Sequence, residues 1–316
     1  MIRNGRKNSK QLYKCKECGK QFLGGRRRNK VQVITYYVEG KQTLSQLAQR
    51  YRISERTIQR DLAGMRFVRK IAKVKDVTIQ LDTTYWGRNF GLMVIKDALR
   101  NKILWHKYVR NETISQYMEG ISWLKSNGFR IYGAVIDGMR GLAQALYPIP
   151  VQMCQFHQIL ITRRYLTQEP ELEASIELLS LVKNITKMDK ESFVGAFNDW
   201  SEKYQNVINE RIRDKRIKRH TPPYMRPKLR SAYLSLRRNM TLLWTFYDRP
   251  ETGLPNTNNA LEGVFSDIKS KVRAHRGISK DNRRKLLDEY IIKRQNPIQG
   301  APCIGFYPTF CLLRVF

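Results

Sequence analysis

The chain has 316 residues, 41% of them hydrophobic, which is enough for one sizeable core and a small accessory domain. Its 59 Lys and Arg outnumber 27 Asp and Glu, giving a formal net charge of +32 and favouring a polyanionic partner, above all nucleic acid. On charge alone the alternative is a ribosomal-type or merely soluble basic protein. Apolar runs fall short of the ~18 residues of a membrane span, and five cysteines do not indicate a disulfide framework, so we expect a reducing cytoplasm and no membrane partner.

Residues 1–28 form a polar, basic segment that contains one Cys-x₂-Cys pair. Cys15 and Cys18 are followed by Gly19 and Phe22, a spacing typical of a zinc knuckle. A closed structural site needs four ligands, and no second pair lies nearby. We therefore expect a basic arm with half of a zinc ribbon, shortened on its N-terminal side, which binds Zn²⁺ weakly. An arm with two free thiols is the alternative.

Residues 29–66 have the pattern of a three-helix DNA-binding unit of the helix-turn-helix type. A first amphipathic helix ends at Gly40, Thr43 is placed to cap a second helix, and Ser54 to cap a third. The third helix would bury Ile58 and turn a polar face outward. On that face we expect contacts to base edges and phosphates from Arg56, Thr57, Gln59 and Arg60. The alternative is a small helical domain whose basic face is only solvated.

The next part of the chain predicts an α/β domain with a mixed sheet. Residues 67–76 are charged and indicate a linker. The first three strands can form a meander, and the later two can be added in parallel. The predicted strands are 77–83, 90–97, 102–109, 130–136 and 150–154, with an amphipathic helix at 113–127.

Residues 158–249 follow a helical pattern. One apolar stripe comprises Leu172, Ile176, Leu179, Val182 and Ile185, and another Phe193, Phe197, Trp200, Tyr204 and Val207. The basic run 211–219 is either a solvated face or a contact to the DNA backbone, and the basic character of the chain favours contact. Residues 296–316 match no regular pattern and are expected to form an irregular tail.

Three acids lie in comparable settings. Asp82 closes an apolar strand, Asp137 follows another, and Glu262 lies at the start of a helix. An isolated Asp is far more often a turn or surface group, but carboxylates on three elements could hold two Mg²⁺ ions about 3.5–4 Å apart. Asp267 is five residues beyond Glu262 and projects about 140° away, so only one of the two can face such a site. Glu262, near the positive helix N-terminus, is the predicted ligand.

Other side chains are expected to support these acids. Lys269 and Arg273 share a flank of the helix with Glu262 and are candidates for DNA binding. Cys154 and His157 are too few for a zinc site, and nothing else supports a Cys–His nucleophile. We expect both to have a structural role beside Asp137, with a DNA phosphate as a further contact for His157.

Taken together, these motifs resemble a DDE transposase of the Mutator-like class found in bacterial insertion sequences. The first acid's motif is similar to Leu-Asp82-Thr-Thr-Tyr and the second's to Ile-Asp137-Gly-Met-Arg-Gly-Leu. The class's Cys-x₂-His is similar to Cys154-Gln-Phe-His157, and its third acid to Asn258-Asn-Ala-Leu-Glu262-Gly. The helical stretch between Asp137 and Glu262 resembles the all-helical insertion of the class. The half ribbon and the tail depart from it.

The resemblance implies a ribonuclease H-like core over 77–157 and 250–295, with an all-α insertion at 158–249. It implies strand cleavage and transfer by Asp82, Asp137 and Glu262 with Mg²⁺ (or Mn²⁺). The implied partners are double-stranded DNA, as terminal inverted repeats and target, and further copies of the chain in a dimer or larger nucleoid-associated assembly. Two rivals remain. One is a catalytically inactive, sequence-specific DNA-binding protein derived from a transposase, and the other is a ribonuclease H-like nuclease or resolvase.

Overall fold

The computed structural model describes residues 1–24, 29–64, 74–212, 222–275 and 278–295. The predicted tail, most of the linker 67–76 and most of the basic run 211–219 lie outside the described residues. Contacts divide the chain into two compact units. Unit 1 comprises Met1–Val68, Ser270–Tyr290 and Ile298–Phe316, and unit 2 comprises Arg69–Lys269 and Ile291–Pro297. Helices α12 (Asn259–Ala274) and α13 (Lys280–Gln295) therefore contribute to both units.

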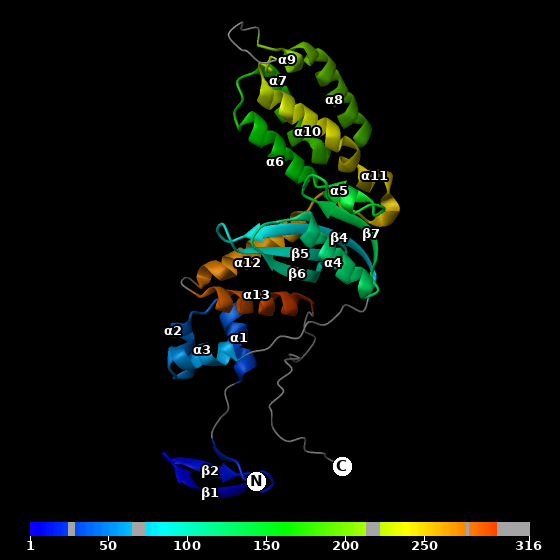
Figure 1. The fold of residues 1–316 in the computed structure, drawn as a ribbon. Coiled ribbons are helices and arrows are strands. Elements are labelled where there is room, and N and C mark those ends of the chain that lie inside the picture. Colours follow the sequence, from blue (N-terminus) through cyan, green and yellow to red (C-terminus); the bar gives the residue numbers. More distant parts are fainter. Residues whose placement is uncertain (25–28, 65–73, 213–221, 276–277, 296–316) are drawn as a thin grey trace. The chain divides into compact units, whose positions relative to one another are not determined.

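Unit 2 contains a mixed five-stranded sheet in the order β6-β5-β4-β7-β8 (Figure 1). The first three strands form an antiparallel meander, and β7 and β8 are added parallel to β4, as predicted. The strands are β4 (Asp76–Tyr85), β5 (Gly91–Asp97), β6 (Lys102–Val109), β7 (Arg130–Ile136) and β8 (Val151–Met153).

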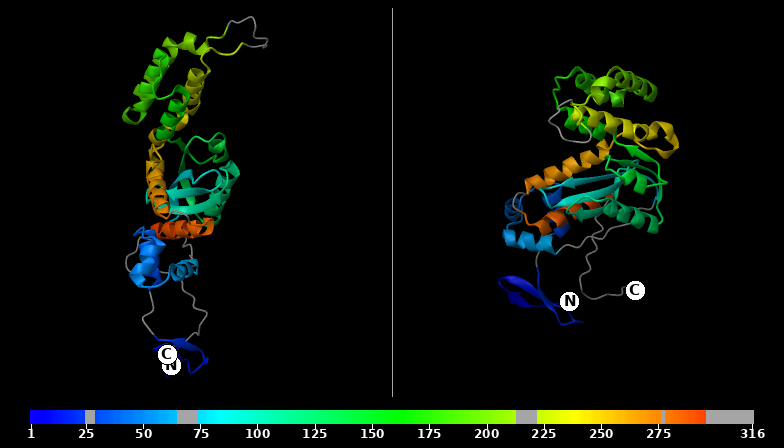
Figure 2. Two further views of the ribbon diagram at one scale, coloured as in Figure 1. Left: turned by 90° about the vertical axis from the view of Figure 1, so that its left-hand side faces the viewer. Right: turned by 45° about the horizontal axis from the view of Figure 1, so that its top comes forward.

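The two faces of the sheet differ in chemistry because β4 alternates apolar and polar side chains. Val77, Ile79 and Leu81 join the hydrophobic core under α4 (Ile114–Ser126) and the short helix α5 (Leu142–Ala145). The residues between them, Thr78, Gln80 and Asp82, are buried on the other face. Helix α12 lies along that second face (Figure 2). The sheet is thus covered on both sides, with a polar layer on one.

The helical pattern between β8 and α12 is also present, and it forms a separate hydrophobic core. Its helices are α6 (Gln155–Leu166), α7 (Glu173–Lys183), α8 (Lys190–Lys203), α9 (Gln205–Asn209), α10 (Pro227–Leu243) and α11 (Thr245–Asp248), with short 3₁₀ turns Ile185–Lys187 and Pro250–Thr252. Phe193, Phe197, Trp200 and Tyr204 are buried as predicted. None of the described helices is long and apolar enough to cross a membrane.

Two sequence-based details in this region are wrong. Ile176 is 49% exposed, because α7 turns a face containing Ala174, Leu178 and Val182 toward the core. The helical region begins at Gln155, the start of helix α6, rather than at residue 158, because strand β8 ends at Met153. His157 therefore lies in the first turn of a helix, which aims its side chain differently from a strand residue.

The N-terminal segment is a three-stranded antiparallel sheet rather than a plain basic arm. Its strands are β1 (Ile2–Lys7), β2 (Lys10–Lys14) and β3 (Gln21–Leu23). The strands carry mostly exposed polar residues, so no apolar alternation marks them in the sequence. The rings of Tyr13 and Phe22 stack with centroids 5.7 Å apart across β2 and β3.

The three helices predicted at 29–66 are present as α1 (Lys30–Val38), α2 (Leu44–Tyr51) and α3 (Glu55–Ala63). Both predicted caps form. Thr43 makes a capping box with Gln46, and the Ser54 hydroxyl accepts the Thr57 N–H. Arg52 takes the left-handed conformation, φ 52°, in the turn between α2 and α3.

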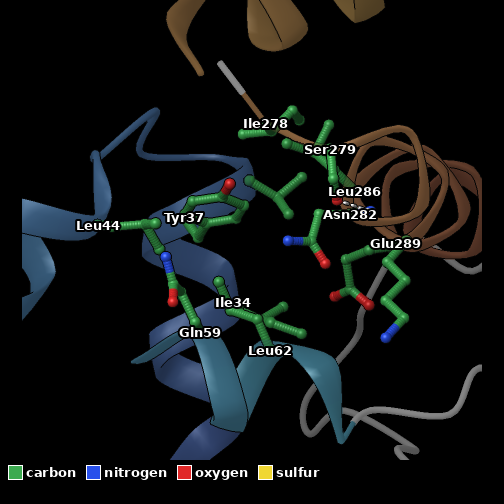
Figure 3. A pocket seen from close by; sticks show the side chains of 12 residues that line it. Ile34, Tyr37, Leu44, Gln59, Leu62, Ile278, Ser279, Asn282, Leu286 and Glu289 are labelled. Carbon is green, nitrogen blue, oxygen red and sulfur yellow. Dashed lines mark hydrogen bonds between the residues drawn. The ribbon is translucent and has the colours of Figure 1, made fainter. Parts of the chain in front are cut away.

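Unit 1 also includes residues 270–290, which the sequence analysis had assigned to the catalytic core. His275 Nε2 lies 2.8 Å from the Tyr37 carbonyl oxygen, and Lys285 Nζ donates to the Ala63 carbonyl at the end of α3 (2.8 Å). Side chains of α1, α3 and α13 line a pocket of about 300 Å³ (Figure 3). The end of α12 and the start of α13 thus complete the three-helix unit.

Candidate active site

Asp82 and Asp137 lie at matching positions on neighbouring parallel strands. Gln80 of β4 pairs with Val135 of β7, and each acid follows two residues later in its own strand direction. Because side chains alternate along a strand, both acids project to the α12 face, beyond Gln80 and Val135. The fold therefore brings these two predicted site residues together at the carboxyl edge of the sheet.

Asp82 is held in a buried and electrostatically unfavourable place. Its side chain is buried, with the residue only 8% exposed, and its Oδ1 accepts the Thr83 N–H at 2.7 Å. Burial, followed by the negative charge of Asp137, raises the pKa of Asp82 well above its usual range. Glu112 and Glu262 raise it further, so the third predicted acid also acts on this carboxyl group.

Asp137 stands at a sharp turn that needs a glycine. Its Oδ1 accepts the Met139 N–H at 3.1 Å, across Gly138. Gly138 has φ 96°, and a Cβ there would lie 2.4 Å from the side chain of Met153. The Asp-Gly pair in the sequence is thus explained by a tight turn that points the carboxylate outward from the end of β7.

Glu262 lies in the first turn of α12 and reaches the site from across the sheet face. Its N–H donates to the Asn258 carbonyl (3.0 Å), and its Oε1 lies 3.7 Å from His157 Nε2. Asp267, the alternative acid on α12, is half-buried and has contacts of its own. Glu262 is the acid of this helix whose charge is felt at Asp82.

Cys154 and His157 support different parts of the site. Cys154 lies beside Asp137, because its N–H donates to the Ile136 carbonyl at 2.8 Å, whereas His157 lies against Glu262 rather than Asp137. Cys154 is buried, and its Sγ accepts the Asn258 N–H at 3.2 Å. Burial raises the pKa of this thiol, which argues against a nucleophilic role. His157 faces Glu262, and its buried Nδ1 has no hydrogen-bond partner among the described residues.

Glu112 is a neighbour of the site that the sequence analysis missed. It accepts a hydrogen bond from the Tyr117 hydroxyl, which lies 3.0 Å from Thr83 Oγ1 next to Asp82. Burial, together with the charge of Asp137, raises the pKa of Glu112. The position of Glu112 shortly after a predicted strand could have revealed it. Strand β6 is parallel to β4 through two antiparallel pairings, so an acid shortly after β6 reaches the same edge as Asp82.

The acids suit a hard divalent cation by their chemistry. All are carboxylates, which Mg²⁺ prefers, and an added cation would relieve the repulsion that raises the pKa of Asp82. As the side chains stand, no three His, Cys, Asp or Glu residues in the described ranges are drawn together tightly enough to hold a metal ion. Asp82 accepts the N–H of the next residue of its strand, Asp137 accepts the N–H of Met139, and Glu262 is turned toward His157. The donor set therefore fits Mg²⁺ in type.

The predicted DNA-binding residues are distributed over both units. On α3, Arg56, Gln59 and Arg60 are exposed, while the Thr57 hydroxyl lies 3.0 Å from Ser54 Oγ within the cap. Gln59 also lines the pocket of unit 1. On α12, Lys269 belongs to unit 2 and Arg273 to unit 1, and both are exposed.

The Cys-x₂-Cys pair lies on the turn between β2 and β3. Hydrogen bonds from the backbone N–H groups of Cys18 and Glu17 lower the pKa of the Cys15 thiol. Such a turn favours a thiolate, as a zinc knuckle requires, but it offers only two sulfur ligands. Weak zinc binding stays a prediction.

Comparisons with known proteins give limited guidance. A scan against protein-family models finds no match, and a search of curated proteins finds none either. Among solved structures, the chain is similar to one described as a Drosophila P element transposase strand transfer complex, with 10% identity and a TM-score of 0.42. The match covers 89% of this chain and 95% of that one. A likeness at this level assigns no function, so the carboxylates and their surroundings must do so.

Proposed function

We propose that this chain is a DDE transposase that cuts and joins DNA strands with Asp82, Asp137 and Glu262. One observation carries the proposal. Asp82 within β4 and Asp137 directly after the adjacent parallel strand β7 occupy matching positions, and Glu262 comes from a helix lying across the same face. The sheet order, with a meander followed by two parallel strands, supports the expected ribonuclease H-like core. The charge of +32 suits a DNA substrate.

In this proposal Asp82, Asp137 and Glu262 would hold two Mg²⁺ ions, or Mn²⁺. When bound, such ions supply a Lewis acid that favours attack by water or a DNA 3′-hydroxyl and departure of the 3′-oxygen. The chain's own residues supply the placement. Gly138 turns Asp137 outward, the Thr83 N–H orients Asp82, and His157 lies against Glu262. Exposed basic side chains would neutralise the DNA backbone.

The finer parts of the proposal concern the class and its partners. The Mutator-like class of bacterial insertion sequences is the one whose motifs these residues resemble. The substrates would be the terminal inverted repeats of the element and a target duplex. The exposed Arg56, Gln59 and Arg60 of α3 suit major-groove contacts to the repeats. Assembly of two or more copies on DNA would bring both ends together.

The test compares two acids on one helix. Glu262→Gln keeps the size of the side chain and removes its charge, so it should abolish Mg²⁺-dependent cleavage of an oligonucleotide carrying the element's end. Asp267→Asn is the matched control, and it should keep most of the activity. DNA affinity, measured at the same salt concentration, should be nearly unchanged in both. Cleavage by Glu262→Gln at the wild-type rate would overturn the three-carboxylate assignment.

A second candidate is a sequence-specific DNA-binding protein derived from a transposase that no longer cuts. Its supporting observation is that no three acidic side chains converge on one point within the described ranges. It predicts a wild-type protein that prefers terminal repeats over random DNA yet leaves both uncut with Mg²⁺ or Mn²⁺. The same cleavage assay therefore separates the two candidates.

A further inference from the structure

Asn258 connects three parts of the site through its own hydrogen bonds. Its side chain is completely buried, and its Nδ2 donates to the Leu81 carbonyl of β4 at 3.1 Å. Its backbone N–H donates to Cys154 Sγ, which follows β8 (3.2 Å). Its carbonyl accepts the N–H groups of Leu261 (2.8 Å) and Glu262 (3.0 Å) in the first turn of α12. One residue thus joins two strands and a helix.

These bonds act on the acids at very short range. Leu81 immediately precedes Asp82 in β4, so the Asn258 side chain is hydrogen-bonded to the strand at the residue next to Asp82. Glu262 is one helical turn beyond Asn258, and its own N–H ends on the Asn258 carbonyl. Asn258 therefore links Asp82 and Glu262 within a few bonds on each side.

Asn258 is the last of three polar anchors along the same face of β4. The Thr78 hydroxyl donates to the Thr252 carbonyl, and Gln80 Nε2 donates to the Thr257 carbonyl (3.2 Å). The buried Lys96 Nζ in turn donates to Gln80 Oε1 at 2.7 Å. The polar layer of the sheet thus ties down the segment 252–258, and Asn258 is the anchor nearest the acids.

The chemistry of the side chain is specific to asparagine. The Nδ2 group is used, while the buried Oδ1 has no hydrogen-bond partner among the described residues. A buried oxygen without a partner is unfavourable, so an asparagine at this position costs stability at its Oδ1. We infer that this cost is offset by the hydrogen bond that its Nδ2 donates. Aspartate at this position would set a carboxylate against the Leu81 carbonyl, and alanine or serine would not reach it.

We propose that Asn258 is a positioning residue that sets Glu262 relative to Asp82 for strand cleavage. This proposal rests on the proposed function, because it assigns a task within that same site. The proposal adds a requirement to the presence of the three acids. Glu262 supports cleavage only when the start of α12 is hydrogen-bonded to β4, the strand that carries Asp82.

The test uses the full chain and a matched pair of anchors. Asn258→Ser removes the bond to Leu81 but keeps a residue that suits a helix N-terminus, so the protein should fold. Thr78→Val removes the equivalent anchor at Thr252, which is ten residues from Glu262. Both should lower the melting temperature. Misplacement of a reacting group by about 1 Å can cost ~100-fold in rate, so single-turnover cleavage should fall by about that factor in Asn258→Ser and stay near wild type in Thr78→Val.

Two further readouts separate positioning from simple loss of stability. Hydrogen exchange of the full chain without DNA should show faster exchange at Leu261 and Glu262 in Asn258→Ser and unchanged exchange there in Thr78→Val. DNA affinity should be unchanged in both. Equal cleavage rates per folded molecule in the two variants would overturn the proposal even if wild type is active. A wild type that cuts no DNA would instead overturn the proposed function.

Discussion

At the scale of single residues, Asp82 shows how a buried cluster of acidic side chains costs stability. It is buried near Asp137, and its pKa is raised well above its usual range by burial and by that neighbour's charge. A raised pKa in the folded state means that stability is greatest at low pH, where the group is protonated, and is lost as the pH rises through the folded-state pKa. At neutral pH, without a cation, this buried acid therefore opposes folding, because the same carboxyl group ionises freely in the unfolded chain.

Asp82→Asn should therefore stabilise the metal-free protein. With a chelator present at pH 7, we expect its free energy of unfolding to rise by about 0.5–2 kcal/mol, the usual range for stabilising substitutions at functional sites. The gain should shrink as the pH falls and wild-type Asp82 becomes protonated, while cleavage is lost at every pH. Asp267→Asn serves as the control. Denaturant unfolding at pH 5 and 7 measures this, and a less stable Asp82→Asn at pH 7 would contradict it.

The residues that escaped sequence analysis did so for a physical reason. Asp82, Asp137 and Glu262 could be picked out because Asp82 lies in an apolar strand, Asp137 directly follows another, and Glu262 lies in the first turn of an amphipathic helix. Glu112 was missed because it lies in the connection after β6, outside the apolar pattern, and its place at the site depends on the direction of β6 and on a hydrogen bond from Tyr117. His157 was assigned to the correct neighbourhood but to a different acid, since helix α6 starts earlier than the apolar pattern indicates.

At the scale of elements, apolar periodicity predicted the central strands and the amphipathic helices, but not the exposed strands or the surface that each helix covers. The five central strands, helix α4 and the capped helices α2 and α3 follow from apolar runs and Ser or Thr caps. The N-terminal strands were missed because a small, exposed sheet has little apolar surface to reveal it. Residues 270–290 were assigned to the sheet domain because a sequence pattern shows that a helix is amphipathic but not which surface it covers.

Helix α3 carries the prediction that belongs to this scale. Arg60 is exposed on it, near the exposed Gln59. If Arg60 reads a base, Arg60→Ala should weaken binding to a terminal repeat by about 1–3 kcal/mol and relax the preference for that base pair. Binding titrations on repeat, single-substituted repeat and random DNA at one salt concentration measure both effects. An equal loss on all three would identify a backbone contact instead.

At the scale of the whole molecule, the three-helix unit is not contiguous in sequence. It depends on His275, whose ring centroid lies 4.0 Å from that of Tyr37 with the two rings tilted, and on Lys285, which donates to the end of α3. Lys271 also pairs with Glu39 at 3.0 Å. A DNA-binding fragment cut from the N-terminal part alone would lack all of these contacts and would expose apolar residues that line the pocket of Figure 3.

A protein that ends at residue 269 should therefore have a destabilised three-helix unit. Amide protons of α1 and α3 should exchange at least about tenfold faster than in the full chain, which corresponds to about 1.4 kcal/mol of lost local stability. Ending the chain at residue 295 is the control, because it keeps the contacts of His275 and Lys285. Equal protection in the two truncated proteins would show that α1–α3 fold without help from the C-terminal helices.

The hydrogen bonds that hold the segment before α12 also bear on when Glu262 can join Asp82 and Asp137 during synthesis. The bonds from Thr78, Gln80 and Asn258 join residues that are 174 and 177 positions apart in the chain. The meander and its core with α4 are complete long before residue 258 leaves the ribosome, and contacts of such long range form late. We therefore expect Glu262 to join the site after the meander has folded. A nascent or prematurely terminated chain holds Asp82 and Asp137 but not Glu262, so under the proposed function it would lack the third carboxylate that cleavage requires.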